Sequence, residues 1–306
     1  MNGRRSTIRA LVCVVAVTAT FSACGGSPTG SPAAATGDVS TPIPASSAPS
    51  ASVLASPSAA SVAPSLAVVP GPSVDASQNP AQIANGSAYH PVVDPGAFTT
   101  DVSNPYFPLA PGTVFTYDGG GEHSVMTVTD GTRMIMGIPS VVVRDRVYEN
   151  GALTEDTFDW YAQDLAGHVW YMGEDTAECA GTKVTGRSGS WEAGVGGAKP
   201  GVVMLARPAL GEAYRQEYLR GEAEDVAKVL KLGATLRSGS TTYRHVLVTE
   251  ERTALEPAII EHKLYAPSVG LIEEQLVRGG TGTVRLTDVS TTSDPGRLAG
   301  GRLCRG

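Results

Sequence analysis

The stretch "EDTFDWYAQDLAGHVWYMGEDT", residues 155–176, decides the fold that the sequence predicts. It holds two of the three tryptophans of the chain, two tyrosines and six carboxylates within 22 residues. Apolar and polar residues alternate on both sides of residues 165–167, which is typical of two β-strands joined by a tight turn. We therefore predict a β-hairpin here.

The turn of this hairpin sets which side chains share a face. In "DLAGH", Gly167 occupies the left-handed position of a three-residue loop, so Asp159 opposes Gly173 across the strands. One face then forms the core, with Phe158, Trp160, Ala162, Trp170 and Met172. The opposite face is expected to be an exposed polar patch with Asp159, Tyr161 and Tyr171. A two-residue turn would instead place Asp159 against Glu174, a like-charge pair that is costly without a ligand, and the turn chemistry favours the first arrangement.

The same period of two recurs through residues 94–290, in segments such as "TVFTYDG", "RHVLVTEERT" and "VGLIEEQLV". Turn residues separate the segments, and Asn150-Gly151 is a strong hairpin signal. Short connections favour an antiparallel meander. We predict one mainly β domain, built as a curved open sheet, a half-barrel or a sandwich, with at most one short helix. That helix would span residues 222–232, which fit an acid-capped helix and a strand about equally well.

The N-terminus has the pattern of an export signal, with three arginines before an apolar run that ends in "FSAC", residues 21–24. Small residues before Cys24 and two glycines after it resemble the lipobox of bacterial lipoproteins, although Phe21 stands where that family prefers leucine. The resemblance implies a signal peptide over residues 1–23 and a lipid on Cys24. The chain would then lie outside the cytoplasm, anchored to a membrane without a spanning helix.

Residues 24–93 are rich in Ser, Pro, Ala, Gly and Thr, and only Asp38 and Asp75 are charged. Such a segment buries too little apolar surface to offset the entropy of ordering, so we predict a disordered tether, whose lone aromatic residue is Tyr89. Residues 291–306 are again polar and Gly-rich and are predicted to form a flexible tail. Cys179 and Cys304 remain outside the signal and the lipid site, and an oxidising compartment favours a disulfide between them over two free thiols.

The net charge of the chain is −7, and it becomes −10 without residues 1–23, which hold three arginines and no acid. An acidic protein has no electrostatic footprint for nucleic acid, is repelled by anionic lipid headgroups and suits cationic ligands. The five histidines form no zinc motif, and phosphate-loop, dinucleotide and serine-hydrolase motifs are absent from the sequence. We therefore expect no metal and no cofactor, and the catalytic residues, if any, are unknown.

Several segments of the domain, among them "NPYFPLAPGTVFTY" (104–117), "GSWEAG" (189–194) and "YAPSVGLIEEQ" (265–275), resemble a family of uncharacterised exported bacterial lipoproteins. The resemblance covers most of the domain and implies no activity. More remotely, the meander is similar to half-open β-sheet proteins that carry lipoproteins or lipids in the cell envelope, a likeness of fold that does not give function.

Three functional hypotheses follow. The first is a non-catalytic, lipid-anchored envelope protein that binds a lipid, a glycan or another protein on the concave face of its sheet, with candidate ligand-binding residues Asp159, Tyr161, Tyr171 and Glu174. The second is an envelope hydrolase with a carboxylate pair drawn from Asp159, Glu174 and Glu192. The third is a structural lipoprotein without a small ligand. Arg215, in a strand of alternating polar residues, is expected to be an ion partner on a sheet face.

Overall fold

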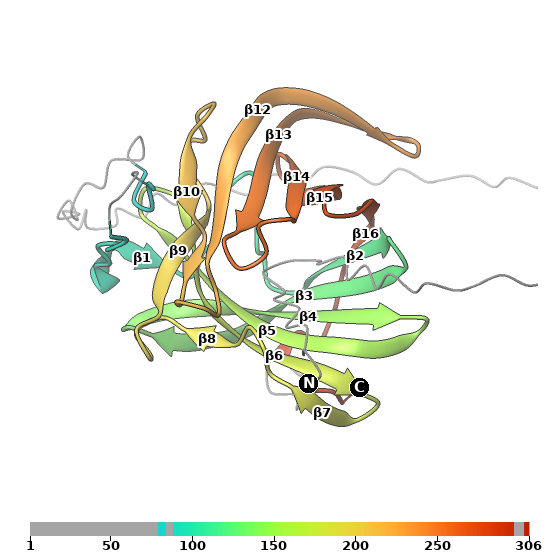
Figure 1. Ribbon diagram of the computed structural model, residues 1–306, viewed down its shortest axis with the longest axis horizontal. Coiled ribbons are helices and arrows are strands. Elements are labelled where there is room, and N and C mark those ends of the chain that lie inside the picture. Colours follow the sequence, from blue (N-terminus) through green and yellow to red (C-terminus); the bar gives the residue numbers. More distant parts are fainter. Residues whose placement is uncertain (1–78, 84–87, 297–302, 306) are drawn as a thin grey trace, which may run out of the picture. The chain divides into compact units, whose positions relative to one another are not determined.

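The structure, a computed structural model, describes residues 79–83, 88–296 and 303–305 (Figure 1). The predicted signal peptide, Cys24 and the predicted tether as far as residue 78 lie outside these residues. In the part that is described, a short 3-10 turn, η1 (Pro95–Ala97), precedes a 16-stranded antiparallel sheet. The prediction of a mainly β, antiparallel domain is confirmed. Within the same residues, no helix has the length and hydrophobicity needed to span a bilayer.

The strands are β1 (Phe98–Thr99), β2 (Thr113–Gly119), β3 (Glu122–Ile135), β4 (Ile138–Glu149), β5 (Ala152–Asp164), β6 (Val169–Ala180), β7 (Lys183–Gly186), β8 (Trp191–Glu192), β9 (Lys199–Met204), β10 (Ala213–Arg215), β11 (Glu217–Tyr218), β12 (Asp225–Ser238), β13 (Thr241–Thr253), β14 (Ile260–Ala266), β15 (Gly270–Arg278) and β16 (Gly282–Thr291).

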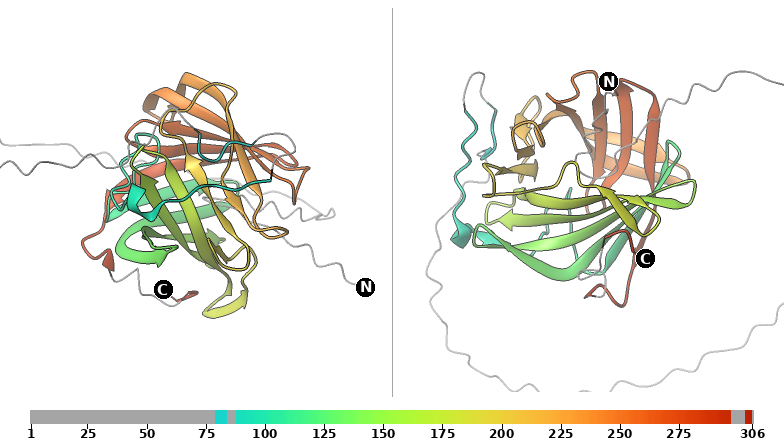
Figure 2. Two further views of the ribbon diagram at one scale, coloured as in Figure 1. Left: turned by 90° about the vertical axis from the view of Figure 1, so that its left-hand side faces the viewer. Right: turned by 60° about the horizontal axis from the view of Figure 1, so that its bottom comes forward.

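Two meanders make up the sheet. Strands β2 to β6 pair in chain order, strands β12 to β16 do the same, and the pairing of β16 with β2 joins the two sets. The sheet then curls back on itself, because β9, beyond β6, contacts β10, which pairs with β12 at the other end of the order. Figures 1 and 2 show this curvature, which leaves the sheet nearly closed around an interior face.

Within residues 222–232, the segment from Asp225 onward is strand rather than helix, and residues 222–224 precede the strand. Strand β12 begins at Asp225 and pairs with β13 from the pair Asp225 and Thr253 to the pair Ser238 and Thr241 at the tip. Burial alternates along its start, where Ala227 and Val229 are buried and Lys228 between them is exposed. Strand β13 hydrogen-bonds to the backbone groups along one edge of β12. This pairing with a later segment outweighs the local helical spacing of the apolar residues.

The predicted hairpin is present as β5 and β6, with Gly167 at a φ of +98° in the turn. Near the turn the predicted register holds, since Ala162 opposes Trp170. A β-bulge between Trp160 and Tyr161 then shifts it by one residue, so the predicted pairing of Asp159 with Gly173 is wrong. Asp159 opposes Glu174 instead.

The bulge has an identifiable cause at Gly173. This residue has a φ of +136°, and a side chain there would collide with the backbone carbonyl of Trp191 in β8, which pairs with this part of β6. A bulge re-aims the side chains that follow it. The close approach of β8 therefore decides which residues of β6 point inward, and no local pattern within the hairpin records it.

The N-terminal and C-terminal described segments are fastened to the sheet. Asn79 Nδ2 donates to the Ala213 carbonyl at 3.2 Å, and Tyr89 Oη donates to the Pro200 carbonyl at 2.7 Å. Residues 79–83 and 88–93, which the sequence places in the tether, thus lie against the domain. At the other end, the predicted disulfide joins Cys179 to Cys304 with a Cα separation of 5.5 Å.

Candidate functional site

The four candidate ligand-binding residues of the hairpin come together, but in the protein interior. The exposed fractions are 3% for Asp159, 0% for Tyr161, 0% for Tyr171 and 5% for Glu174. The prediction of an exposed polar patch is therefore wrong. The reason is the curl of the sheet, which covers the face of β5 and β6 that a flat hairpin would present to water.

Direct contacts tie this interior group together. Tyr171 Oη donates to Asp159 Oδ1 at 2.8 Å, and the Tyr161 ring stacks on the Tyr171 ring with centroids 5.2 Å apart. Thr176 Oγ1 donates to Glu174 Oε2 at 2.7 Å. The hydroxyl of Tyr161 is buried without a hydrogen-bond partner. The group is a packed polar core in which the tyrosines and carboxyls contact one another.

A further member, Glu217 of β11, is one that sequence reasoning missed. Its Oε2 accepts a hydrogen bond from Trp191 Nε1 at 3.0 Å, and the Trp191 ring packs edge-on against Tyr171 with centroids 5.1 Å apart. Glu192, a candidate from the sequence, instead pairs with Arg133 at 2.5 Å on the partly exposed side of the sheet. Only the folded sheet brings Glu217 to the hairpin, and no motif links the two segments.

Burial raises the pKa of Asp159, Glu174 and Glu217 well above the ordinary carboxyl range. Neighbouring acids add to this effect, Asp145 at Asp159 and the Asp159 carboxyl itself at Glu174. A raised pKa favours the protonated form of a carboxyl, and a protonated carboxyl can act as a hydrogen-bond donor. This explains how two acids can stand opposite each other in the interior.

This arrangement does not fit glycoside hydrolysis. That chemistry needs one ionised carboxylate and access for a sugar and a water molecule, whereas Asp159 and Glu174 are enclosed and both are driven toward the neutral form. Across residues 79–83, 88–296 and 303–305, no group of three or more His, Cys, Asp or Glu side chains is placed to hold a metal ion.

A second buried polar group surrounds Lys263 of β14. Its Nζ lies 2.9 Å from Glu251 Oε2 and 3.7 Å from Glu274 Oε2, and all three side chains are buried. Burial alone would lower the pKa of Lys263, but Glu251 and Glu274 more than offset this and raise it. Tyr265 Oη also donates to Glu251 at 3.2 Å. Both carboxyl oxygens of Glu274 are buried without a hydrogen-bond partner, so the direct ion pair of this group is the one between Lys263 and Glu251. We assign this buried pair a structural role.

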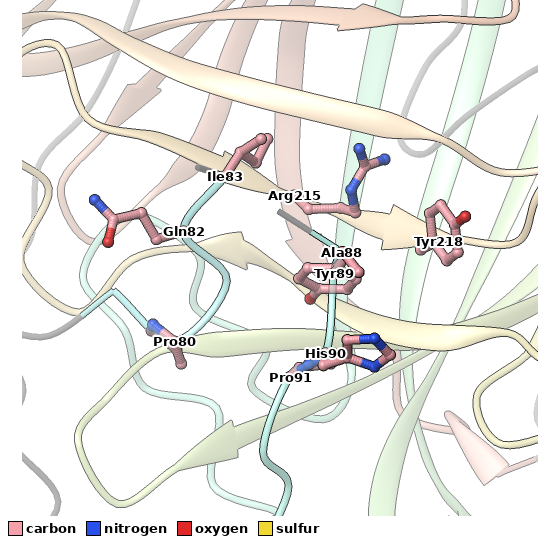
Figure 3. A pocket seen from close by; sticks show the side chains of 9 residues that line it. All are labelled: Pro80, Gln82, Ile83, Ala88, Tyr89, His90, Pro91, Arg215 and Tyr218. Atoms are coloured by element: carbon pink, nitrogen blue, oxygen red, sulfur yellow. The ribbon is translucent and has the colours of Figure 1, made fainter. Parts of the chain in front are cut away.

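The structure also has a pocket at the surface, between the N-terminal segment and strands β10 and β11. Its volume is about 350 Å³, within the range of small-ligand sites. Figure 3 shows Tyr89 and His90 on the N-terminal segment, beside Arg215 at the end of β10 and Tyr218 at the end of β11. The lining residues are Pro80, Gln82, Ile83, Ala88, Tyr89, His90, Pro91, Arg215 and Tyr218.

Cations and aromatic rings converge on this pocket. The Arg215 guanidinium lies 5.7 Å from the Tyr89 ring centroid and 5.2 Å from that of Tyr218. Lys199 Nζ lies 5.4 Å from the Tyr218 ring, donates to the Tyr89 carbonyl at 2.6 Å and lies 3.3 Å from His90 Nδ1. Burial raises the pKa of Tyr89, and Arg215 partly opposes the rise. The phenol of Tyr89 is thus a neutral wall of the pocket.

Neither cation has an acidic partner among the residues that the structure describes. Arg215 donates through Nη1 to the Glu224 carbonyl at 3.2 Å, and its Nε is buried without a hydrogen-bond partner. The salt bridges of the described chain include neither Arg215 nor Lys199. The expectation that Arg215 is an ion partner on a sheet face is therefore wrong, and the side chain lines a pocket instead.

Comparison with known proteins gives a remote likeness. The sequence matches no protein-family model and no curated protein. Two solved structures that match are a Bacteroides fragilis protein described as exported with a YmcC-like fold, at 12% identity and a TM-score of 0.38, and a Parabacteroides distasonis protein described as a lipoprotein, at 10% identity and a TM-score of 0.34. The matches cover 61% and 60% of this chain, and 99% and 98% of those chains. At these values neither protein lends an activity or a ligand to this chain.

Proposed function

We propose that the protein is a lipid-anchored extracytoplasmic binding protein whose β domain takes a small anionic ligand in the pocket of Tyr89, Arg215 and Tyr218. One observation carries the proposal: Arg215 lines the pocket, Lys199 lies beside its lining residues His90 and Tyr218, and neither cation has a carboxylate partner among the described residues. The chain as a whole is acidic, so partners for both cations are abundant, and two cations left together without one favour an anion from outside.

The chemistry of the pocket suits a carboxylate or phosphate group on a small molecule. A guanidinium offers two parallel donors to such a group, and an ammonium adds a point charge. The rings of Tyr89 and Tyr218 lie beside the Arg215 guanidinium, and apolar ring surface next to a cation strengthens its electrostatic attraction for an anion. The preference is the reverse of that predicted from net charge, because ligand affinity depends on the local field of the pocket rather than on the sum over the chain.

The proposed location rests on two features. The first is the lipobox-like "FSAC" with Cys24, and the second is the Cys179–Cys304 disulfide, a bond that persists in oxidising compartments. Replacement of Cys24 by Ala should release the protein from the membrane into the medium. Retention of the Cys24→Ala chain at the membrane would contradict the anchor and would leave the pocket proposal standing.

The interior face of the sheet gives less support to lipid carriage. A carrier would need an apolar cavity beneath the sheet, and Tyr161, Tyr171 and Trp191 pack together at that place. The pocket described above is also too small for an acyl chain with its headgroup, and polar groups line it. We therefore favour a compact anionic ligand over a lipid.

Isothermal titration calorimetry with inorganic phosphate, citrate and benzoate tests the pocket. Loss of charge-assisted hydrogen bonds worth roughly 1.5–3 kcal/mol predicts that Arg215→Gln weakens binding by about 10-fold to 150-fold. Arg207→Gln is the matched control, because Arg207 is exposed and forms no salt bridge among the described residues. Equal affinity of the Arg215 and Arg207 variants, or no heat with any of the three anions, would reject the proposal.

A further inference from the structure

The hairpin of β12 and β13 forms an arm, defined here as residues 226–249, with a charge opposite to that of the rest of the molecule. Its 24 residues contain two lysines and two arginines and no aspartate or glutamate. The chain as a whole has a net charge of −7. A one-sign segment of this length in an acidic protein is a distinct surface feature, separate from the pocket.

The tip of the arm projects from the sheet as two strands. Strand β10 pairs with β12 only from Val226 to Lys228, and β14 pairs with β13 only from Leu247 to Glu251. Between these limits the two strands pair only with each other, as far as Ser238 and Thr241. Figure 1 shows them running together beyond β14 and β15. Among the described residues, no third strand pairs with either outer edge of the tip, and the Tyr106 hydroxyl donates to the His245 carbonyl on the β13 edge at 3.0 Å.

The charged side chains of the arm are free to meet a partner. Lys231, Arg237 and Arg244 are exposed, and none forms a salt bridge with another described residue. Leu232, beside Lys231, is 43% exposed. Tyr243 and Leu236 pack partly against the core, which holds one side of the arm to the domain. The combination is a basic surface with an exposed aliphatic side chain, on a supported but projecting element.

We propose that this arm docks the domain onto an anionic lipid bilayer surface. Charge complementarity supports the choice, because each basic side chain near such a surface increases binding by about fivefold, within a Debye length of roughly 10 Å. The exposed Leu232 among the cations can insert into the interfacial layer of a bilayer. A soluble polyanion has no such apolar layer, so this side chain favours a bilayer as the partner. The acidic remainder of the molecule is repelled from the same surface, so the docking has a defined orientation.

The length of chain outside the structure permits this contact. Residues 25–78 precede the described part, and a chain of that length spans at most about 190 Å at roughly 3.5 Å per residue. An anchor at Cys24 would therefore let the arm reach the bilayer and would raise its effective concentration there. Weak attraction between three or four basic side chains of the arm and the bilayer then suffices to keep the domain at the membrane surface.

Co-sedimentation with vesicles tests the arm without the anchor. The protein is purified from residue 24 onward with Cys24→Ser, so that no acyl chain contributes, and is mixed with vesicles of about 30% phosphatidylglycerol in phosphatidylcholine. We expect binding that weakens with added salt and is absent on pure phosphatidylcholine. Equal binding to both vesicle types would overturn the proposal, as would binding to soluble polyphosphate without binding to the vesicles.

Matched variants locate the effect. The triple variant Lys231→Ser, Arg237→Ser and Arg244→Ser should lose binding by on the order of 100-fold, at about fivefold per charge. The control triple, Lys183→Ser, Arg207→Ser and Arg220→Ser, removes the same charge from exposed sites elsewhere. A charge-keeping triple, Lys231→Arg, Arg237→Lys and Arg244→Lys, should bind normally and separates charge from folding. Equal losses in the arm and control triples, or loss in the charge-keeping triple, would overturn the proposal.

Discussion

Removal of the Cys179–Cys304 disulfide tests whether the C-terminal residues belong to the cooperative fold. The bond spans a sequence separation of 125 residues. A cross-link over a loop of this length restricts the unfolded chain by about 5 kcal/mol in the chain-entropy relation, and measured losses for native disulfides are about 2–5 kcal/mol. We expect Cys179→Ala with Cys304→Ala to lower the free energy of unfolding by roughly 3–5 kcal/mol.

Native contacts of the tail modulate this value. The backbone N–H of Cys304 donates to Asp156 Oδ2 at 2.8 Å, and Arg144 Nη2 donates to the Arg305 carbonyl at 3.2 Å. Asp156 and Arg144 also pair with each other through two hydrogen bonds, at 2.8 and 2.7 Å, in a buried site. If residues 303–305 detach when the disulfide is removed, the ion pair loses its hydrogen bonds to the Cys304 N–H and the Arg305 carbonyl and becomes exposed to water. This exposure would lower the free energy of unfolding further.

Thermal unfolding and urea titration measure the effect. For a domain of this size about 1 kcal/mol corresponds to roughly 2–4 °C, so the melting temperature should fall by about 6–20 °C. Wild-type protein with the disulfide reduced should behave like the double alanine variant. A change below about 1 kcal/mol in both samples would refute the reasoning, because the tail would then lie outside the cooperative unit.

Two further perturbations address the buried polar groups. Burial raises the pKa of Asp159 and Glu174, so the folded chain retains protons that the unfolded chain releases above about pH 4. Their contribution to stability is full below the unfolded pKa and falls as pH rises toward the folded pKa. As the pH is raised from about 5, the variant Asp159→Asn with Glu174→Gln should therefore lose less stability than wild type in urea titrations, and equal slopes would contradict the assignment. Lys263→Met should cost about 3–5 kcal/mol, because it leaves the buried Glu251 carboxylate without its cation. Adding Glu251→Gln should recover part of that loss, and a double-mutant cycle without coupling would show that the pair does not interact.

Local patterns along the chain account for the strands and for the turn near Gly167. The pairing of Ala162 with Trp170 follows from turn chemistry, which acts over a few residues. The pairing of Asp159 with Glu174 does not, because β8 imposes the bulge through its contact at Gly173. Residues 222–232 were ambiguous for the same reason, since a long partner strand from a later segment decided them.

The surface pocket was hidden from the sequence in a similar way. Tyr89 stands in a segment whose composition indicates a tether, and Arg215 stands in an alternating strand that indicates a sheet face. Only the folded chain places these two side chains together, across more than a hundred residues of sequence. Composition is an average over a segment. A single tyrosine whose hydroxyl donates to the Pro200 carbonyl therefore does not alter the composition that predicts a tether.

The sequence by itself determined the β class, the antiparallel order of neighbouring strands, the hairpin turn and the pairing of Cys179 with Cys304. These depend on side-chain periodicity, on turn residues and on the number of available cysteines, all of which are local or countable. Only the tertiary structure decided which face of the hairpin is interior, which acids meet there and where two cations stand without an acidic partner among the described residues. The curl of the sheet sets these features, and it arises from contacts between strands far apart in the chain.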